Sequence, residues 1–308
     1  MARFSSMVVL ARRETTYGTD IVPTATADAM LFQDVDWTPM EAEQVERPMV
    51  LPHYGNDPVS LVATRNRLQG GVDLAGGGTP VGTVPRFGAL LRACALAETV
   101  VATTRVDYTP ITGAEDSASL YHFVDGTRQQ GLGAIGDFTL ELNARQIPRI
   151  RFDLQALYVA PTAVVLPAPT LTAFQAPLPV SQANTPTATL NGQNVVLRSF
   201  SYTHGNQIAM RDMPGSRRLR ITGRQPRATI TIEAPDGLTP NFFAPIGTLV
   251  PLTIVHGTTA GNIATVTLGQ ARLLNPRYSN EDNVLMLSFD LRPEPTAAGN
   301  DELMLRFT

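Results

Sequence analysis

The stretch Ala228-Thr-Ile-Thr-Ile-Glu233 alternates apolar and polar side chains. In an extended chain successive side chains point to opposite faces, so Ile230 and Ile232 would lie on one face and the threonines and Glu233 on the other. The same alternation returns in Ser288-Phe-Asp-Leu291. Both stretches therefore predict β-strands with one buried face.

Strand-like runs make up most of the chain, and glycine and proline separate them. The chain has 24 glycines and 24 prolines in 308 residues, which predicts many turns between short apolar runs. The further predicted strands are Ala29–Trp37, Arg67–Leu74, Leu120–Val124, Ile135–Leu142, Ile150–Val159, Val195–Tyr202, Leu249–His256, Ile263–Leu274, Val284–Leu291 and Leu303–Phe307. The sequence therefore predicts a mainly β fold.

One segment has the spacing of a short helix. Phe87, Leu90, Leu91 and Cys94 fall at i, i+3, i+4 and i+7, and Pro85 suits a first helical turn. This apolar stripe predicts that Cys94 is a packed core residue and not a nucleophile. Because Cys94 is the one cysteine in the sequence, an intramolecular disulfide and a multi-cysteine metal site are excluded.

A proline-rich stretch divides the chain near its middle. Between Pro161 and Pro186, prolines punctuate a segment rich in alanine, threonine and glutamine that has no charged residue. Such a composition is typical of an extended, semi-rigid linker. We predict a first domain over residues 1–165, a linker over 166–187 and a second domain over 188–308.

The two halves share short matches. Pro85-Arg-Phe-Gly-Ala-Leu-Leu91 aligns with Pro240-Asn-Phe-Phe-Ala-Pro-Ile246, and Phe152-Asp-Leu154 aligns with Phe289-Asp-Leu291. Between these landmarks the first half is longer by 18 residues. Both halves also share the order strand, long loop, strand, short helix, strands. We therefore expect a duplicated domain, each copy with a short flanking α-helix.

The charge pattern argues against a nucleic-acid-binding protein. The net charge is −3, with 24 arginines, no lysine and 27 acidic residues. Gripping phosphates takes clustered cations, and neither half is strongly basic. The apolar run Met7–Leu10 is followed almost at once by two arginines, and no run approaches the length of a membrane span. We expect a soluble protein that matures in a reducing cytoplasm.

No catalytic constellation stands out. His53, His122, His204 and His256 lack the spacing of a metal motif, and the hydrolase motif G-x-S-x-G is missing. The run from Gly76 to Gly82 lacks the lysine of a P-loop and reads as a flexible or tight connection. An acidic cluster comprises Asp34, Asp36, Glu41, Glu43 and Glu46. It leaves two interpretations, a divalent-cation site and a solvated acidic surface, of which the second is the commoner.

Two stretches carry a family resemblance. Glu14-Thr-Thr-Tyr-Gly-Thr-Asp20 is similar to the opening of many phage tail tube proteins, which begin with an arm that contains an acid and an aromatic-Gly-Thr turn. The ending, from Ala264–Leu268 through the polar Tyr278–Asp282 into Val284–Leu291, resembles the closing hairpin of the same family. The resemblance covers most of the chain in the order of its elements.

The resemblance implies a structural protein with no cofactor and no enzymatic activity. Each domain would be a two-sheet β-sandwich or barrel with a flanking helix. One sheet of each domain would join its neighbours around a ring, and stacked rings would form the tail tube through which the genome is ejected. With two domains in each chain, three chains would complete a ring of six similar domains; the alternative is the family's simpler hexamer.

Loops and arms would join one ring to the next on this interpretation. The expected stacking loops are Met40–Thr64 and His204–Arg217. The candidate contact residues are Glu14, Tyr17, Gly18, Asp20, Glu46, Met49, His53, Tyr54, Met210, Arg211, Asp212 and Met213. Expected partners are further copies of the chain, the tape-measure protein and DNA in the lumen without specific DNA binding, the tail terminator and the distal tail proteins, with no membrane. The protein would reside in the virion tail after synthesis in the host bacterial cytoplasm.

Two other functions stay open at this point. A surface or carbohydrate-binding β-sandwich (an adhesin module) would need an aromatic platform, yet aromatics make up 6% of the chain and Trp37 is its one tryptophan. An enzyme would need a metal in the acidic cluster.

Overall fold

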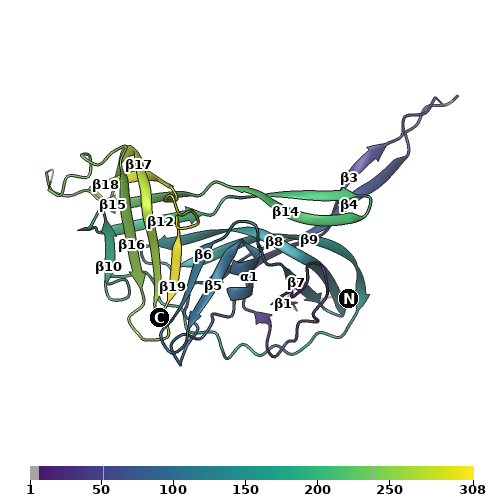
Figure 1. Ribbon diagram of the computed structural model, residues 1–308, viewed down its shortest axis with the longest axis horizontal. Coiled ribbons are helices and arrows are strands. Elements are labelled where there is room, and N and C mark those ends of the chain that lie inside the picture. Colours follow the sequence, from purple (N-terminus) through teal and green to yellow (C-terminus); the bar gives the residue numbers. More distant parts are fainter. Residues whose placement is uncertain (1–6, 51, 238) are drawn as a thin grey trace.

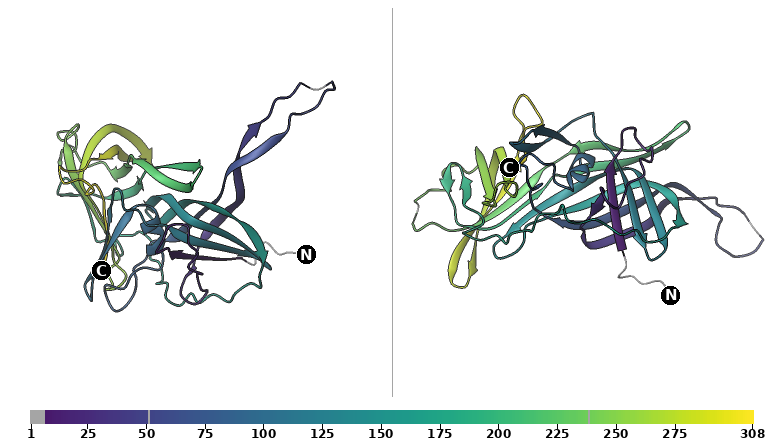
Figure 2. Two further views of the ribbon diagram at one scale, coloured as in Figure 1. Left: turned by 45° about the vertical axis from the view of Figure 1, so that its right-hand side comes forward. Right: turned by 90° about the horizontal axis from the view of Figure 1, so that it is seen from below.

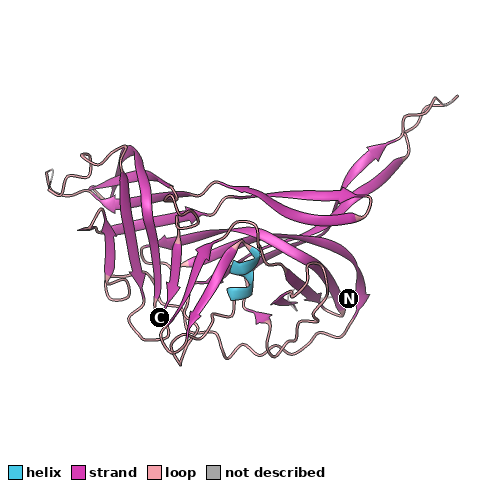
Figure 3. Cartoon of the chain, viewed as in Figure 1, coloured by secondary structure: helices cyan, strands magenta, loops and turns pink. Residues whose placement is uncertain are grey.

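The computed structural model describes residues 7–50, 52–237 and 239–308, and strands make up most of it (Figures 1 and 3). The first half contains β1 (Met7–Arg13), β2 (Ala29–Met30), β3 (Gln33–Glu46), β4 (Val59–Asp73), α1 (Gly88–Ala93), β5 (Leu96–Val101), β6 (Arg105–Pro110), β7 (Ala118–Val124), β8 (Thr127–Asn143) and β9 (Arg149–Ala163). The second half contains β10 (Thr187–Leu190), β11 (Gln193–Asn194), β12 (Leu197–Thr203), β13 (Asn206–Met213), β14 (Ser216–Arg224), β15 (Arg227–Glu233), β16 (Leu249–His256), β17 (Ala264–Glu281), β18 (Val284–Pro293) and β19 (Met304–Phe307). The predicted mainly β fold is confirmed.

Strand pairing follows the same order in the two halves. The first half pairs as β3-β4-β9-β8-β7-β1-β2, and every neighbouring pair is antiparallel. The second half pairs as β12-β15-β18-β17-β16-β10-β11, again antiparallel throughout. The hairpin β5–β6 is extra in the first half, and it lies in the interval where that half is 18 residues longer. The repeated order supports the duplication that the sequence predicts.

Two junctions join the halves. β8 pairs with β12 over Thr139–Asn143, and β6 pairs with the C-terminal strand β19. Side chains of both halves, Phe138 and Phe200 among them, belong to one hydrophobic cluster. The two predicted domains thus share a sheet and a core, and the boundaries at residues 165 and 187 stay a prediction.

The closed barrel was a wrong prediction for the single chain. Through the described residues the strand pairings never return to their starting strand, so the sheet is open. The physical reason lies at its ends, because β3 and the C-terminal part of β17 have a paired neighbour on one side each. Backbone donors and acceptors on the other side remain available.

A short helix, α1, lies where the sequence predicts one in the first half, whereas the matching place in the second half holds turns. Phe87, Leu90, Leu91 and Cys94 are all buried around α1, and burial raises the pKa of the Cys94 thiol. At the matching place, residues 241–248 form turns with i→i−3 backbone hydrogen bonds. These turns end at Gly247, whose φ of 80° cannot continue a helix.

The proline-rich segment packs against both halves, and on the second half the Asn262 side chain donates to the Ala176 carbonyl at 3.1 Å. Val180 is buried and exchanges backbone hydrogen bonds with the turn at Arg145 and Gln146, of 2.9 and 2.8 Å. Farther upstream, the Thr170 nitrogen donates to the Ala25 carbonyl at 3.0 Å. These bonds hold the segment against the folded body, and its role as a linker between domains stays a prediction.

Candidate assembly surface

One stretch of sheet runs across both halves and has a polar face. Its strand order is β3-β4-β9-β8-β12-β15-β18-β17, and side chains directly opposite each other in this register share a face. The polar face comprises Gln33, Asp36, Thr38, Arg67, Gln69, Asp73, Arg149, Arg151, Asp153, Gln155, Asp137, Thr139, Glu141, Asn143, Ser199, Ser201, Thr203, Arg227, Thr229, Thr231, Glu233, Ser288, Asp290, Arg277 and Ser279, and the apolar Met286 shares it. The opposite face supplies core residues such as Phe152 and Phe289.

Four arginines on the polar face are held by carboxylates, whereas Arg227 has none within 4.0 Å among the described residues. The Arg67 Nε donates to Asp153 Oδ1 at 2.6 Å, and Arg151 lies 3.5 Å from Glu141. Arg277 forms an ion pair with Asp290. These pairs are partly exposed, so their contribution to stability is small. Their main effect is on the electrostatic potential of this face, because each carboxylate neutralises the positive charge of the arginine beside it.

The same sheet ends in two open borders. Among the described residues, β3 pairs with β4 alone, and Leu274–Glu281 of β17 pairs with β18 alone. Tyr278 on the β17 border is 57% exposed. β12, in contrast, is flanked by β8 and β15. We call these two segments the β3 border and the β17 border.

The hairpin β3–β4 extends as an arm that projects away from the body (Figures 1 and 2). The predicted contact residues Glu46, Met49, His53 and Tyr54 all lie on its outer part, where each is exposed. Tyr54 is fully exposed, which leaves a large amphipathic side chain without cover. A contact of this arm with another subunit stays a prediction.

The second expected stacking loop is the hairpin β13–β14, which lies on the first half. Asp212 Oδ2 accepts a hydrogen bond from the Ala63 nitrogen at 3.1 Å, and Arg217 donates to Thr64. Met210, Arg211, Asp212 and Met213 line a surface pocket together with Glu43 and Val62. The two segments chosen from the sequence therefore meet at the base of the arm.

The motif at residues 14–20 forms an anchor inside the chain. Glu14 is 3% exposed, and its carboxylate accepts hydrogen bonds from the Gly18 nitrogen, the Ser117 and Ser119 hydroxyls and the Gly133 nitrogen at 2.6–2.9 Å. Because a buried carboxylate is costly without donors, this cluster fixes the turn after β1 onto β7 and β8.

Tyr17 and Asp20 extend the anchor in two directions. The Tyr17 hydroxyl accepts a hydrogen bond from the Leu219 nitrogen at 2.7 Å, and the Arg218 guanidinium lies 4.6 Å from the centre of the Tyr17 ring. Burial raises the pKa of Tyr17. Asp20 accepts from the Tyr121 hydroxyl at 2.5 Å. The contacts of Glu14, Tyr17, Gly18 and Asp20 with other subunits stay a prediction; within one chain these residues join the N-terminal segment to both halves.

His122, in β7, and His204, between β12 and β13, are packed structural residues. Burial lowers the pKa of His122 to about 4, and its ring stacks on Trp37 with 5.2 Å between centroids. Burial lowers the pKa of His204 to about 3, and its Nδ1 pairs with the Tyr202 hydroxyl. Across the ranges that the structure covers, no cluster of three candidate metal ligands occurs. The acidic cluster is spread along the arm and its base, with Glu41 paired to Arg65.

The glycine run before α1 is a tight connection. Gly78 donates its backbone nitrogen to the Gly261 carbonyl at 2.9 Å, and Gly76 donates to Asn262 Oδ1 at 2.8 Å. A Cβ atom at Gly76 would meet the Gly261 carbonyl oxygen at 2.0 Å. The glycines therefore permit close contact with the second half, as the tight-connection interpretation expects.

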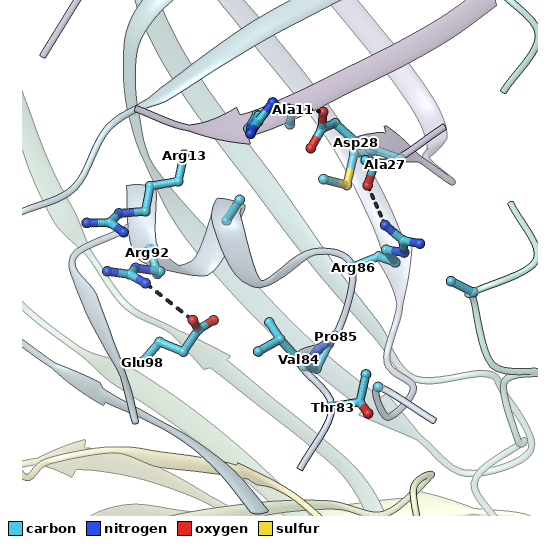
Figure 4. Close-up of a pocket in the computed structure, with 15 residues that line it drawn as sticks. Ala11, Arg13, Ala27, Asp28, Thr83, Val84, Pro85, Arg86, Arg92 and Glu98 are labelled. Carbon is cyan, nitrogen blue, oxygen red and sulfur yellow. Dashed lines mark hydrogen bonds and ion pairs between the residues drawn. The ribbon is translucent and has the colours of Figure 1, made fainter. Parts of the chain in front are cut away.

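A surface pocket beside α1 is lined by several arginines (Figure 4). Arg92 bonds Asp116 at 2.7 Å and Glu98 at 3.2 Å, and Arg86 donates to the Ala27 carbonyl. These cations are already engaged by groups of the same chain. The pocket thus contributes ion pairs that hold α1 against its surroundings.

The sequence analysis did not predict the β3 border or the β17 border. The polar segment Tyr278–Asp282 and the strand Ala29–Trp37 are both visible in the sequence, but which strands end a sheet depends on the pairing of distant segments. One signal was present: Tyr278 is a large aromatic side chain set among polar residues at the end of a strand.

A comparison with protein families gives one full-length match. The family of phage tail tube proteins matches residues 5–308. None of the curated proteins compared with the chain matches it. In the described part of the chain, no helix has the length and apolarity needed to cross a membrane. With a match over essentially its whole length, an open sheet with two free borders and a mainly β fold, the chain belongs to the phage tail tube protein family.

Proposed function

We propose that this chain polymerises as stacked rings into the tail tube, the conduit through which the genome leaves the capsid. The observation that carries the proposal is the sheet that runs across both halves and ends in the β3 border and the β17 border. An edge strand presents unpaired backbone groups and invites another strand. Because the two borders belong to different strands, copies join head to tail, and such a contact closes into a ring.

The ring is a trimer with pseudo-sixfold symmetry. Each chain contributes four strands from each half to the continuous sheet, in matching order. Three chains then supply six similar units, the number that the family's one-domain hexamers supply. The domains at residues 1–165 and 188–308, joined by the linker 166–187, are the repeating units. A ring of six chains is the alternative.

The polar face lines the lumen. Its serines, threonines and carboxylates offer DNA little to bind, and its arginines at positions 67, 149, 151 and 277 are held in ion pairs. Arg227, at the end of the face, is the exception: it is exposed and has no carboxylate within 4.0 Å among the described residues. Unpaired cations would bind phosphates and slow the passage of DNA. The tape-measure protein fills the same channel before ejection, and the tail terminator and distal tail proteins cap the ends. The chain is made in the host bacterial cytoplasm.

The arm β3–β4 and the hairpin β13–β14 supply contacts between rings. The exposed Met49 on the arm and Met213 on the hairpin are adaptable apolar side chains, and the exposed Tyr54 is a large amphipathic one; both kinds suit such contacts. The protein has no enzymatic role in this proposal. The carbohydrate-binding alternative would need an exposed aromatic platform. The one tryptophan, Trp37, does not supply it, because Trp37 is half-buried and stacks on His122.

Electron microscopy of the purified protein and of virions tests the proposal. We expect stacked rings with a central channel and threefold symmetry. Protein that remains monomeric under all conditions and is missing from virions would contradict it. Sixfold symmetry with one chain per unit would contradict the trimeric ring, but the proposal that the chain forms a tube would still hold.

A further inference from the structure

We propose that the β17 border of one chain pairs antiparallel with the β3 border of a second copy in a defined register, with Asp36 opposite Ser279, Trp37 opposite Tyr278 and Thr38 opposite Arg277. This inference rests on the proposed ring and adds its residue-level contact. The partner is another copy of the same chain. The two halves of one chain already form a junction of this kind, between β8 and β12.

The internal junction supplies a template. β8 of the first half pairs with β12 of the second, with Glu141 opposite Ser201 and Leu140 opposite Tyr202. In the repeated strand order, β8 corresponds to β17 and β12 corresponds to β3. A copy of this junction between chains therefore brings β17 against β3. Repetition of one contact geometry at both kinds of junction gives six equivalent joints in a ring of three chains.

The β17 side of the register follows from the central strands. Arg151 on β9 lies opposite Thr139, and Ser288 on β18 lies opposite Arg277. Arg151 and Ser288 each directly precede the matching Phe-Asp-Leu sequences. Thr139 thus corresponds to Arg277, and Glu141, two residues farther on, corresponds to Ser279.

The β3 side follows in the same way. Asp153 and Asp290, the central residues of the matching sequences, lie opposite Gln69 and Thr229. Gln69 in turn lies opposite Asp36, and Thr229 lies opposite Ser201. Asp36 therefore corresponds to Ser201. Since Ser201 lies opposite Glu141 in the internal junction, Asp36 lies opposite Ser279 in the proposed one.

Side chains at the internal β8–β12 junction are buried, whereas their counterparts on the unpaired β3 and β17 borders are more exposed. Tyr202 and Leu140, which face each other in the internal junction, are 0% and 1% exposed. Their counterparts are Trp37, which is half-buried, and Tyr278, which is 57% exposed. The pairing would cover both aromatic rings on the core side of the sheet. Tyrosine and tryptophan supply large apolar areas with a polar tip, which suits such a contact.

Charge on the polar face is complementary in this register. Asp36 on the β3 border is exposed, and Arg277 on the β17 border has a side chain that is 64% exposed. With Asp36 opposite Ser279, Arg277 stands diagonally across from Asp36 on the same face. Diagonal neighbours are within reach of long side chains, so the arginine can approach this carboxylate as well as Asp290.

Paired cysteines test the register. In the double variant D36C/S279C the new thiols lie directly opposite, about 5 Å apart at Cβ, close to the separation that a disulfide needs. In the control T38C/S279C one thiol moves by two residues on the same face, to a diagonal separation of about 7–8 Å. The native Cys94 is buried and stays out of the reaction.

Mild oxidation of assembled D36C/S279C should remove the monomer band on a non-reducing gel and give a ladder that ends at the trimer. The control should keep most of its monomer. Two results would overturn the pairing: tubes of D36C/S279C that give no disulfide ladder, and ladders of equal strength in both variants. Either result would leave the proposed function unaffected. A wild-type protein that forms no tubes overturns both.

Hydrogen exchange of the unmodified protein gives a second readout, free of any effect of substitution on assembly. Alternate amides over Gln33–Thr38 and Arg277–Glu281 should become protected when monomer assembles into tubes. Protection confined to other segments overturns the pairing.

Discussion

The Tyr17 hydroxyl accepts a hydrogen bond from the Leu219 backbone nitrogen at 2.7 Å, across 202 positions of sequence. Leu219 belongs to β14 and is buried, so this contact ties the N-terminal turn to a hairpin of the second half. The neighbouring Arg218 guanidinium covers the Tyr17 ring. The motif that resembles the family's opening thus joins the N-terminal turn to the second half within one chain.

Removal of the Tyr17 hydroxyl should destabilise the monomer. In Tyr17→Phe the Leu219 nitrogen loses its acceptor, and a buried unpaired donor costs about 1–3 kcal/mol. Urea unfolding of the monomer, followed by fluorescence, measures the free energy of unfolding. Tyr54→Phe on the exposed arm is the matched control and should leave it unchanged. Equal stability of both variants would contradict the assigned role.

Glu14→Gln should be more destabilising than a surface substitution of the same kind. The glutamine amide would point a donor at groups that already donate, namely the Ser117 and Ser119 hydroxyls and two backbone nitrogens. Hydrogen bonds to a charged acceptor contribute about 1.5–3 kcal/mol, so the unfolding free energy should fall by at least about that amount. Glu43→Gln, an exposed site, serves as the control. If the two curves coincide, the carboxylate cluster does not anchor the turn.

Stability should depend on pH through His122. Burial lowers its pKa in the folded protein from 6.5 to about 4, so between these values the unfolded state binds more protons. The free energy of unfolding therefore falls as pH drops from 6.5 to 4, with a slope of up to about 1.4 kcal/mol per pH unit from this group. His122→Phe should reduce the slope, and His53→Phe, at an exposed position, should not. Urea unfolding curves of both variants at several pH values measure these slopes. Equal slopes for His122→Phe and the wild type would contradict the role given to His122.

An added cation on the polar face should slow the passage of DNA. Thr229 is exposed on that face, opposite Ser201 and Asp290. Thr229→Arg should still give tubes but slow genome ejection in vitro, with the delay shrinking as salt rises, because phosphate binding by cations is salt-dependent. Thr229→Gln, of similar length and no charge, should eject at the wild-type rate. Equal rates for all three proteins would place this face away from the lumen.

Shortening the arm should separate ring formation from stacking. Glu46 and Val59 lie directly opposite each other, so residues 47–58 can be replaced by a two-residue Asn-Gly turn that preserves the hairpin register. This variant should form rings and few or no long tubes, as seen by electron microscopy and native mass spectrometry. Tyr54→Ser should have a milder effect in the same direction. Tubes of normal length from the shortened protein would exclude the arm as a stacking element.

Alternation in the sequence located most of the core strands. Leu249–His256 matches β16 in full, and Ala228–Glu233 lies within β15, because inward isoleucines and outward threonines mark these segments. β1, β5, β6, β10 and β11 were missed. β6 alternates, but with charged residues on its outer face, and the other four are short or do not alternate cleanly. His204–Arg217 was expected as a loop because its residues are mostly polar. It contains β13 and the start of β14 instead, a strand pair that packs over the first half.

The assembly surface was only partly predictable. The family resemblance singled out Glu14 and Tyr17 as candidate contacts with other subunits and Met40–Thr64 as a stacking loop. Local sequence could not show that Glu14 is buried within its own chain, because its partners Ser117 and Gly133 lie more than 100 residues away. The two borders depend on the whole order of strands. Only the repeated pairing of the two halves shows where a neighbour is missing.

Electron cryo-microscopy of the assembled tube, at a resolution that separates strands, tests the central claim most directly. The expected result is an unbroken inner sheet in which β17 of each chain hydrogen-bonds β3 of the next, with three chains closing each ring. A tube whose chains leave both of these strands unpaired, or cover them with their own polypeptide, would contradict it.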